Sequence, residues 1–333
     1  MIDTFREKMT GINRLALAVS GGADSICMTL LSHQLKLQPI VLIVDHKLRE
    51  ESSEEAEWVS KYIQSKFQFE TKILTWGDQQ GIKNVQASAR NARYNLLIEE
   101  CKKLNIDYLS TAHNKNDQGE TILMNIMRGS GIDGLVGIKP LSKLLDQNLL
   151  RPMLDFTREE IIQYLNKFDI EWVNDRSNNN SKYERVKIRH LIREIGDSDL
   201  VNAHHLLNRL VLLGNNALRT QNFIDQYVKN KIDNLCYTWS VGLITIDVKQ
   251  LLEEEEEIIL RILRHIIKSV GKQNYFVRLK KLMRLYNSLQ ISFERKINFD
   301  VTLGGCMIWL FLKDEKKYLA ISQEKVKKQQ KYV

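Results

Sequence analysis

A glycine-rich turn near the start of the chain separates an apolar, strand-type run from a helix-compatible run. Residues 15–31 read LALAVSGGADSICMTLL, with SGG as the break. Adjacent glycines let backbone N–H groups converge, and the N-terminus of the following helix adds a positive dipole. The turn therefore predicts a phosphate cradle, with an ordinary tight turn as the alternative. A kinase-type cradle is disfavoured because the loop lacks the lysine of G-x-x-x-x-G-K-[ST]. The phosphate contacts that we expect are Ser20, Gly21, Gly22, Ala23, Asp24 and Ser25.

A second polar segment, AHNKNDQGET at residues 112–121, follows another apolar run and opens a helix. A histidine in this place can donate to phosphate or to a developing charge, and a carboxylate can hold Mg²⁺ or orient the attacking group. We expect Asp24, His113 and Asp117 to be catalytic, with Asp24 and Asp117 as the metal ligands. A purely structural His–Asp pair is the alternative.

Strand-type and helix-type runs alternate around these segments. Apolar runs at 39–44, 69–76 and 107–111 predict further strands, and the runs at 51–67 and 84–104 predict helices. Such alternation is typical of an α/β fold with a doubly wound parallel sheet, whose ligands bind beyond the carboxyl ends of the strands. Polar clusters at 20–25, 45–46 and 112–121 end three of these strands.

The later part of the chain changes in character. Thr157 and Glu160 predict a capped helix over 158–168, glycines at 129–137 predict a flexible loop near the nucleotide, and basic residues crowd into 182–193. Beyond residue 196, helical runs cover 200–230, 248–270 and 276–289, and two strand-type runs follow at 301–312 and 317–322. We expect a domain of residues 1–195 and a smaller, mainly helical domain of residues 196–333, which ends in a short β hairpin and a basic tail.

Composition narrows the class of protein. The 333 residues carry a net charge of +8, which favours a polyanionic partner, and 43% of them are hydrophobic. No apolar run is long enough to cross a bilayer and no secretory signal is evident, so we expect a cytoplasmic protein with no membrane partner. The four cysteines form no C-x-x-C pair, which argues against a zinc site or a disulfide framework.

The motifs together resemble those of the tRNA(Ile)-lysidine synthetases over roughly residues 15–191, with a fainter echo at 302–305. They are SGGADS at 20–25, DHKLR at 45–49, ARNARY at 89–94, AHNKNDQGET at 112–121, RGSG at 128–131, RP at 151–152 and SN at 177–178. The resemblance implies the fold of the N-type ATP pyrophosphatases, whose SGGxDS loop holds ATP while it is split between its α and β phosphates.

The resemblance also implies a reaction. That family adenylates the C2 oxygen of the cytidine at the first anticodon position of a minor isoleucine tRNA with a CAU anticodon, and L-lysine then displaces AMP. The implied small molecules are ATP and Mg²⁺, with no tightly held metal or organic cofactor, and a homodimer is compatible with the sequence. Further ATP contacts would come from Asp45, His46, Arg90, Arg128 and Gly129. Contacts to tRNA would come from Arg93, Arg151, Asp175, Arg185 and Arg189. An ordinary solvated basic surface is the competing interpretation of these arginines.

Two departures from the family pattern limit the transfer. Family members usually carry A-H-H-x-D-D-Q-x-E-T, whereas Asn114 and Asn116 stand here for the second His and the first Asp, and an E-D pair becomes Asn174 and Asp175. A tRNA thiolase of the same superfamily, an ammonia-using or glutamine-fed synthetase for a small molecule, and an RNA-binding protein that has lost catalysis remain the alternatives.

Overall fold

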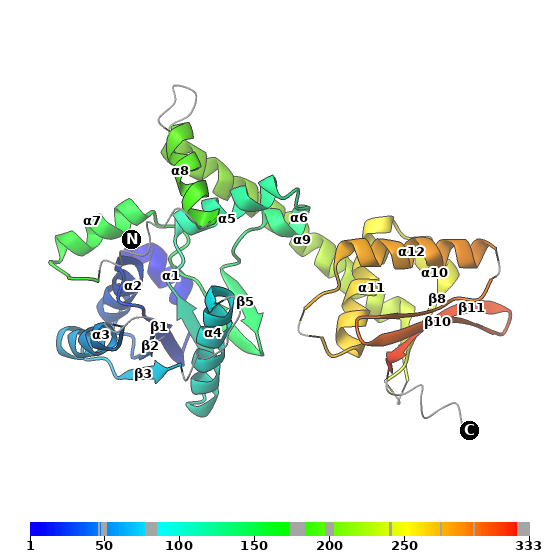
Figure 1. Cartoon of the computed structure of the whole chain (residues 1–333), viewed down its shortest axis with the longest axis horizontal. Helices are drawn as coiled ribbons and strands as arrows, with labels where there is room; N and C mark the ends of the chain where they lie inside the picture. The colour runs from blue at the N-terminus through cyan, green and yellow to red at the C-terminus, as the bar shows by residue number, and fades with distance from the viewer. Residues whose placement is uncertain are drawn as a thin grey trace. The chain divides into compact units, whose positions relative to one another are not determined.

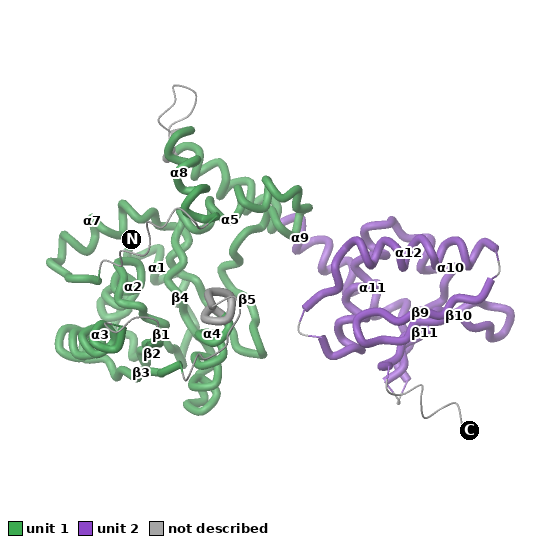
Figure 2. The backbone as a smooth tube through the Cα atoms, in the orientation of Figure 1, with its two compact units in different colours: residues 1–218 green, residues 219–333 purple. Residues whose placement is uncertain are grey.

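The computed structural model describes most of the chain and divides it into two compact units (Figure 2). The described residues are 1–45, 47, 52–76, 85–173, 184–196, 203–239, 242–273, 275–295 and 297–324, and for 85–90, 196, 203 and 204 the backbone alone is described. The first unit comprises residues 1–218 and the second residues 219–333. The division falls within helix α9 (Ala203–Leu235). The domain border that the sequence predicts after residue 195 remains a prediction.

The first unit is built on a six-stranded sheet in the order β3-β2-β1-β4-β6-β5. The strands are β1 (Leu15–Ala18), β2 (Ile40–Asp45), β3 (Thr71–Thr75), β4 (Tyr108–Thr111), β5 (Leu141–Leu144) and β6 (Gln147–Leu150). All neighbouring pairs are parallel except β5 with β6. The predicted α/β fold with a mostly parallel sheet is therefore confirmed, and the β5–β6 hairpin is an addition. Its two turn residues, Leu145 and Asp146, both have positive φ, as tight hairpins require.

Helices cover both faces of this sheet (Figure 1). The helices of this unit before α9 are α1 (Ile2–Met9), α2 (Ala23–Gln34), α3 (Ser52–Phe67), α4 (Val85–Lys103), α5 (Lys115–Met127), α6 (Ile132–Leu135), α7 (Arg158–Lys167) and α8 (Glu184–Gly196). Alternate residues of β1 point to opposite faces: Leu15 and Leu17 pack with α1, α2, α3 and α7, whereas Ala16 and Ala18 pack with α4. The short helix α6 lies in the segment where a flexible loop was expected.

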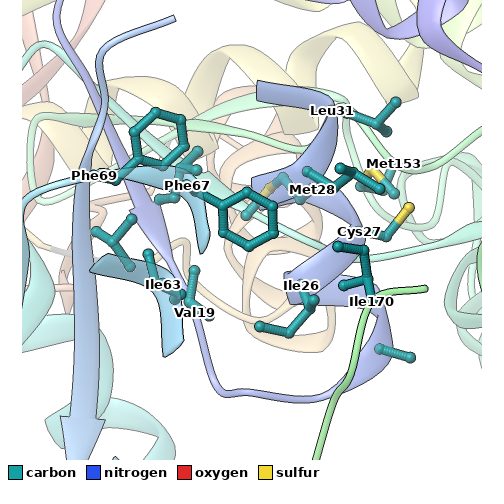
Figure 3. Close-up of a cluster of buried hydrophobic side chains, with 14 of the residues drawn as sticks. Val19, Ile26, Cys27, Met28, Leu31, Ile63, Phe67, Phe69, Met153 and Ile170 are labelled. Atoms are coloured by element: carbon teal, nitrogen blue, oxygen red, sulfur yellow. The ribbon is translucent and has the colours of Figure 1, made fainter. Parts of the chain in front are cut away.

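Hydrophobic side chains form a cluster on each face of this sheet, and the larger cluster fixes the position of α2, the helix that follows the phosphate loop. Ile26, Met28 and Leu31 of α2 are fully buried and pack with Ile63 and other apolar side chains from α3 and the loops (Figure 3). Burying side chains of this size contributes about 1.5–3 kcal/mol each. The N-terminal end of α2 is therefore held firmly at the edge of the sheet.

The strand order creates a natural site for a ligand. β1 has β2 on one side and β4 on the other, so the chain crosses from β1 in opposite directions along the sheet. Doubly wound sheets bind their ligands in a crevice at such a point, beyond the carboxyl ends of the two neighbouring strands, which here are β1 and β4. The SGG turn follows β1, and residues 112–121 follow β4, at this same edge.

The second unit packs helices against a five-stranded antiparallel sheet in the order β7-β8-β11-β10-β9. Its elements after α9 are β7 (Cys236–Thr238), β8 (Ile244–Asp247), α10 (Val248–Leu252), α11 (Glu256–Val270), α12 (Leu279–Glu294), β9 (Asp300–Leu303), β10 (Cys306–Lys313) and β11 (Lys316–Gln323). The expected β hairpin is present as β10 and β11, and it forms part of this larger five-stranded sheet. Gly304 and Gly305, both at positive φ, turn the chain inside the run 301–312, and so split one expected strand into two.

Candidate functional site

The glycine-rich turn has the geometry of a phosphate loop, and one of its two glycines is required by the backbone. Gly21 has a φ of +83°, and a Cβ at this position would lie 2.5 Å from Cγ2 of Val59. Its carbonyl accepts a hydrogen bond from the N–H of Val173 at 2.9 Å. Gly22 has an ordinary φ of −72° and is the N-cap of α2. The turn therefore delivers the chain directly into the positive end of a 12-residue helix.

Ser25 holds this turn closed. Its buried hydroxyl donates to the carbonyl oxygen of Gly22 at 2.9 Å and accepts from the backbone N–H of Ser20 at 3.3 Å. These bonds tie the first turn of α2 back to the loop. The side chain of Ser25, the last serine of the SGGADS motif, thus acts on the shape of the loop, whereas Ser20 remains exposed to solvent.

Asp24 is the carboxylate nearest to this loop, and both of its oxygens are engaged. Oδ1 accepts from Nδ2 of Asn114 at 3.0 Å, and Oδ2 accepts from Nη1 of Arg158 at 2.8 Å. Burial raises the pKa of Asp24 above its usual value, although Arg158 and Asn114 oppose the shift and the nearby Asp117 adds to it. The charges of Asp24 and Asp117 therefore interact across the crevice.

Asn114 and Asp117 form a capping box at the start of α5. The side chain of Asn114 accepts from the N–H of Asp117 at 3.0 Å, and Oδ2 of Asp117 accepts from the N–H of Asn114 at 3.0 Å. The predicted catalytic carboxylate therefore also has a structural function. The first departure from the family pattern has placed the amide of Asn114 between the two carboxylates.

Two further predicted residues stand at the carboxyl ends of strands. His113 follows β4, and its Nδ1 lies 2.9 Å from Oγ1 of Thr111, which orients the ring. Asp45 ends β2 and accepts from the N–H of Lys47 and from the hydroxyls of Ser52 and Ser53, at 2.6–2.9 Å. Burial disfavours the charge on Asp45, but these hydrogen bonds outweigh it and lower the pKa below 3.8. As an ionised group, Asp45 therefore joins the end of β2 to the first residues of α3.

The next turn of α5 brings α8 into the site. Glu120 is almost completely buried, and its Oε1 accepts from Nε of Arg189 at 2.8 Å. Burial raises the pKa of Glu120, and the Arg189 guanidinium opposes that shift. The other oxygen, Oε2, has no hydrogen-bond partner among the described residues. Arg189 thus lies beside the buried carboxyl group of Glu120 and opposes its charge. Glu120 raises the pKa of Arg189, and the charges of Asp117 and Asp24 add to that shift.

Gln118 fixes the segment that follows α6. Its Oε1 accepts from the N–H of Ile138 at 2.6 Å, and its Nε2 donates to the carbonyl of Val136 at 3.1 Å. Gly137 between them has a φ of +68°, and a Cβ there would lie 2.7 Å from Oε1 of Gln118. This segment is therefore clamped onto α5.

Other predicted residues are not brought to Asp24. Arg128 caps the C-terminal end of α5 and pairs with Glu184. Because α5 has 13 residues, this end lies about 20 Å from the N-terminal end, where Asn114 contacts Asp24. Arg151 donates to the carbonyl of Lys139 and to the hydroxyl of Ser142. Gly129 follows Arg128 at positive φ, Arg93 lies in α4, and Arg185 lies in α8, where its charge acts on Glu120. Outside the described residues or side chains lie His46, Arg90, Asn174, Asp175, residues 177–178, Lys182 and the basic tail.

Sequence reasoning missed Arg158 as a site residue. The capping box of Thr157 and Glu160, which was predicted, places it at the first position of α7. What carries it to the crevice is a hydrogen bond from its N–H to Oδ1 of Asn116 at 2.9 Å. That contact joins residues far apart in the sequence, so no local pattern could have revealed it.

The described part of the chain contains no cluster of three or more His, Cys, Asp or Glu that could hold a metal ion. Mg²⁺ needs less than that, because one or two carboxylates and the phosphates of a nucleotide complete its shell. Asp24 and Asp117 fit that requirement. Within the same described residues, no helix is long and apolar enough to span a membrane.

Comparison with known proteins gives consistent matches. The PP-loop domain family matches residues 2–195. The chain is 36% identical over 302 residues to the tRNA(Ile)-lysidine synthase of Wolbachia pipientis wMel, which covers 89% of this chain and 68% of that protein. It is 35% identical over 313 residues to the tRNA(Ile)-lysidine synthase of Wolbachia sp. subsp. Brugia malayi (strain TRS), covering 91% and 71%. The U34-tRNA thiolase NcsA from Methanococcus maripaludis with its [4Fe-4S] cluster shares the fold, with a TM-score of 0.52 and 14% identity over 64% of this chain and 79% of that one.

Proposed function

Because the chain belongs to the PP-loop family and, within it, to the tRNA(Ile)-lysidine synthases, we propose that it joins lysine to a cytidine of tRNA at the expense of ATP. The C2 oxygen of the cytidine at the first anticodon position attacks the α phosphorus of ATP, and pyrophosphate leaves. An amine of lysine then forms a bond to C2, the bond from C2 to the AMP oxygen breaks, and the amine loses a proton. The tRNA is a minor isoleucine tRNA with a CAU anticodon, and the reaction takes place in the cytoplasm.

The observation that carries the proposal is the meeting of the phosphate loop and α5 at Asp24. The loop amides and the N-terminus of α2 would bind the phosphates of ATP. Asp24 and Asp117 would hold Mg²⁺, which neutralises phosphate charge when bound. His113, oriented by Thr111, would stabilise the charge that develops as pyrophosphate leaves.

The proposed RNA contacts are on the basic segment of α8 and on the second unit. Charged side chains there would bind phosphates, and the cytidine would be extruded so that its edge can be recognised. A homodimer remains a prediction.

The test is transfer of lysine to tRNA. The protein is incubated with radiolabelled lysine, ATP, Mg²⁺ and total tRNA, and the label is expected in an isoleucine tRNA through a bond that survives mild alkali, which an aminoacyl ester would not. Asp24→Ala is the matched inactive variant: it should remove pyrophosphate release and leave tRNA binding nearly intact. Wild-type protein that forms no alkali-stable product would contradict the proposal.

The cysteines give no support to the thiolase alternative. Cys27, Cys101 and Cys306 are buried in three different hydrophobic clusters, and Cys236 is half-buried. Burial raises the pKa of Cys27, Cys101 and Cys236 to about 12 and that of Cys306 to about 11. Thiols in such surroundings are protonated at neutral pH and are poor sulfur nucleophiles.

A further inference from the structure

Arg158 places a guanidinium beside the phosphate loop. Its Nη1 lies 2.8 Å from Oδ2 of Asp24, and the two side chains are 41% and 25% exposed. A guanidinium has five N–H donors, and among the described residues Asp24 is its one recorded partner. Its other N–H donors have no recorded partner among the described residues.

The backbone of Arg158 is fixed while its side chain can turn. Its N–H is bonded to Asn116, and the preceding Thr157 closes a capping box with Glu160. One residue earlier, the carbonyl of Phe156 accepts from the N–H of Lys115 at 2.9 Å. The start of α7 is thus joined to the start of α5, and the remaining freedom lies in the arginine's own rotamers.

The ion pair competes with the proposed use of Asp24. Each carboxylate oxygen of Asp24 accepts one hydrogen bond, from Asn114 or from Arg158, so Mg²⁺ would share these oxygens with the two side chains or displace one of them. When Mg²⁺·ATP is bound, Arg158 has to give up or share Oδ2. Asp24 is the second residue of α2, so the released guanidinium starts next to the loop amides. A planar guanidinium pairs with phosphate through two parallel hydrogen bonds, which suits it to the nucleotide's charged end.

We propose that Arg158 binds the β and γ phosphates of ATP, and hence the departing pyrophosphate, and that its ion pair with Asp24 stores the side chain at the loop until the nucleotide arrives. The inference rests on the proposed function, since it assumes that the loop binds ATP. Arg158 is then a substrate-binding residue, and its contact with Asp24 is exchangeable.

Binding measurements with three ligands test this role. Isothermal titration calorimetry in the presence of Mg²⁺ compares ATP, inorganic pyrophosphate and AMP for wild type, Arg158→Gln and Arg158→Lys. Losing a charged, bidentate phosphate contact should weaken ATP and pyrophosphate by about 10- to 100-fold in Arg158→Gln. AMP lacks both phosphates, so its affinity should change by less than about 2-fold. Arg158→Lys keeps a point charge and should fall between, and it carries the test if the glutamine variant fails to fold.

Arg6→Gln is the matched control, because it also removes an arginine from an ion pair, that of Arg6 with Asp3 on the surface of α1. It should leave all three affinities unchanged. If Arg158→Gln binds ATP and pyrophosphate like wild type, or if AMP weakens equally, Arg158 only holds Asp24 and the inference is wrong.

The two proposals fail separately. If wild-type protein transfers lysine to tRNA and Arg158→Gln keeps the wild-type affinity for ATP, the inference about Arg158 is wrong and the proposed function stands. If binding of ATP and pyrophosphate depends on Arg158 but wild-type protein transfers no labelled lysine to tRNA, the proposed function is wrong and the inference about Arg158 stands.

Discussion

Nδ2 of Asn114 donates to Oδ1 of Asp24 at 3.0 Å, and this bond joins the helix that opens after β4 to the helix that opens after β1. The oxygen of the same amide caps the N–H of Asp117. Asparagine is among the best N-cap residues, and it also offers a donor that a carboxylate can accept. Asn114 thus contacts Asp24 through its amide nitrogen and Asp117 through the capping box.

We expect Asn114→Ala and Asn114→Ser to distinguish the capping role of the amide oxygen from the bond that the amide nitrogen makes to Asp24. Alanine removes the cap and should lower the free energy of unfolding by about 1–2 kcal/mol. Serine caps a helix about as well as asparagine but lacks the amide donor to Asp24, so its cost should be smaller and should come from the loss of that bond. Urea unfolding followed by circular dichroism measures both variants. Equal losses would mean that the bond to Asp24, and not the cap, carries the stability.

His113 gives a prediction about rate. His113→Ala should slow pyrophosphate release by about 10²- to 10⁴-fold, which is typical of a group that transfers a proton or stabilises charge in a transition state. Binding of ATP should change much less. Thr111→Val removes the hydroxyl 2.9 Å from Nδ1 and should cause a smaller loss of rate, because the ring stays but is no longer oriented. A histidine variant that loses binding and rate equally would show a structural role.

The local parts of the fold could be predicted and the long-range parts could not. The SGG turn, the alternation of strands and helices and the capping box at Thr157 are written in neighbouring residues. The five-stranded sheet of the second unit is different, because β8 pairs with β11 across much of the unit. Short strands of three or four residues, such as β7 and β8, carry too little alternation to stand out.

The same division applies to the candidate site. Asp24, His113 and Asp117 follow strands and were found from that position. The pairing of Glu120 with Arg189 depends on how α8 packs on α5, and the approach of Arg158 depends on Asn116. Arg189 carried a different prediction, an RNA phosphate contact, because a sequence shows a basic residue but not the buried acid that it neutralises. Its role toward RNA stays a prediction.

Glu120 should make stability depend on pH. Burial raises its pKa above the ordinary value of 4.5, so the native state holds the proton more tightly than the unfolded state. The contribution is fully present below about pH 4.5 and is lost as the pH rises through the folded-state pKa, with a slope of at most about 1.4 kcal/mol per pH unit. Glu120→Gln removes this titration. The free energy of unfolding of wild type relative to Glu120→Gln should therefore fall as the pH rises from about 4 to 7.

Urea titrations at several pH values give both curves. Glu57→Gln serves as the control, since it removes an exposed carboxylate that pairs with Lys61 at the surface of α3. Parallel curves for wild type and Glu120→Gln would show that Glu120 holds its proton equally in both states, which contradicts the raised pKa.

The exposed side of α8 is the surface on which we expect tRNA phosphates. Val186, Ile188 and Ile192 are buried, whereas Lys187 and Arg193 face solvent. These two side chains are therefore better placed to contact RNA than Arg189, which is occupied by Glu120. Each phosphate contact releases condensed cations, so removing both residues should weaken tRNA binding and reduce the slope of log affinity against log salt by about 1 to 2.

Filter binding of tRNA over a range of salt concentrations measures this slope for the double variant of Lys187→Ala and Arg193→Ala. Affinity for ATP alone should stay unchanged, because neither residue touches the phosphate loop. The double variant of Lys61→Ala and Lys103→Ala is the matched control, as both side chains are more than two-thirds exposed, at 79% and 71%, on other helices of the same unit. It should keep the wild-type slope, because side chains outside the docking surface displace no condensed cations when tRNA binds. A wild-type slope in the α8 variant, or an equal reduction in the control, would place the docking surface away from α8.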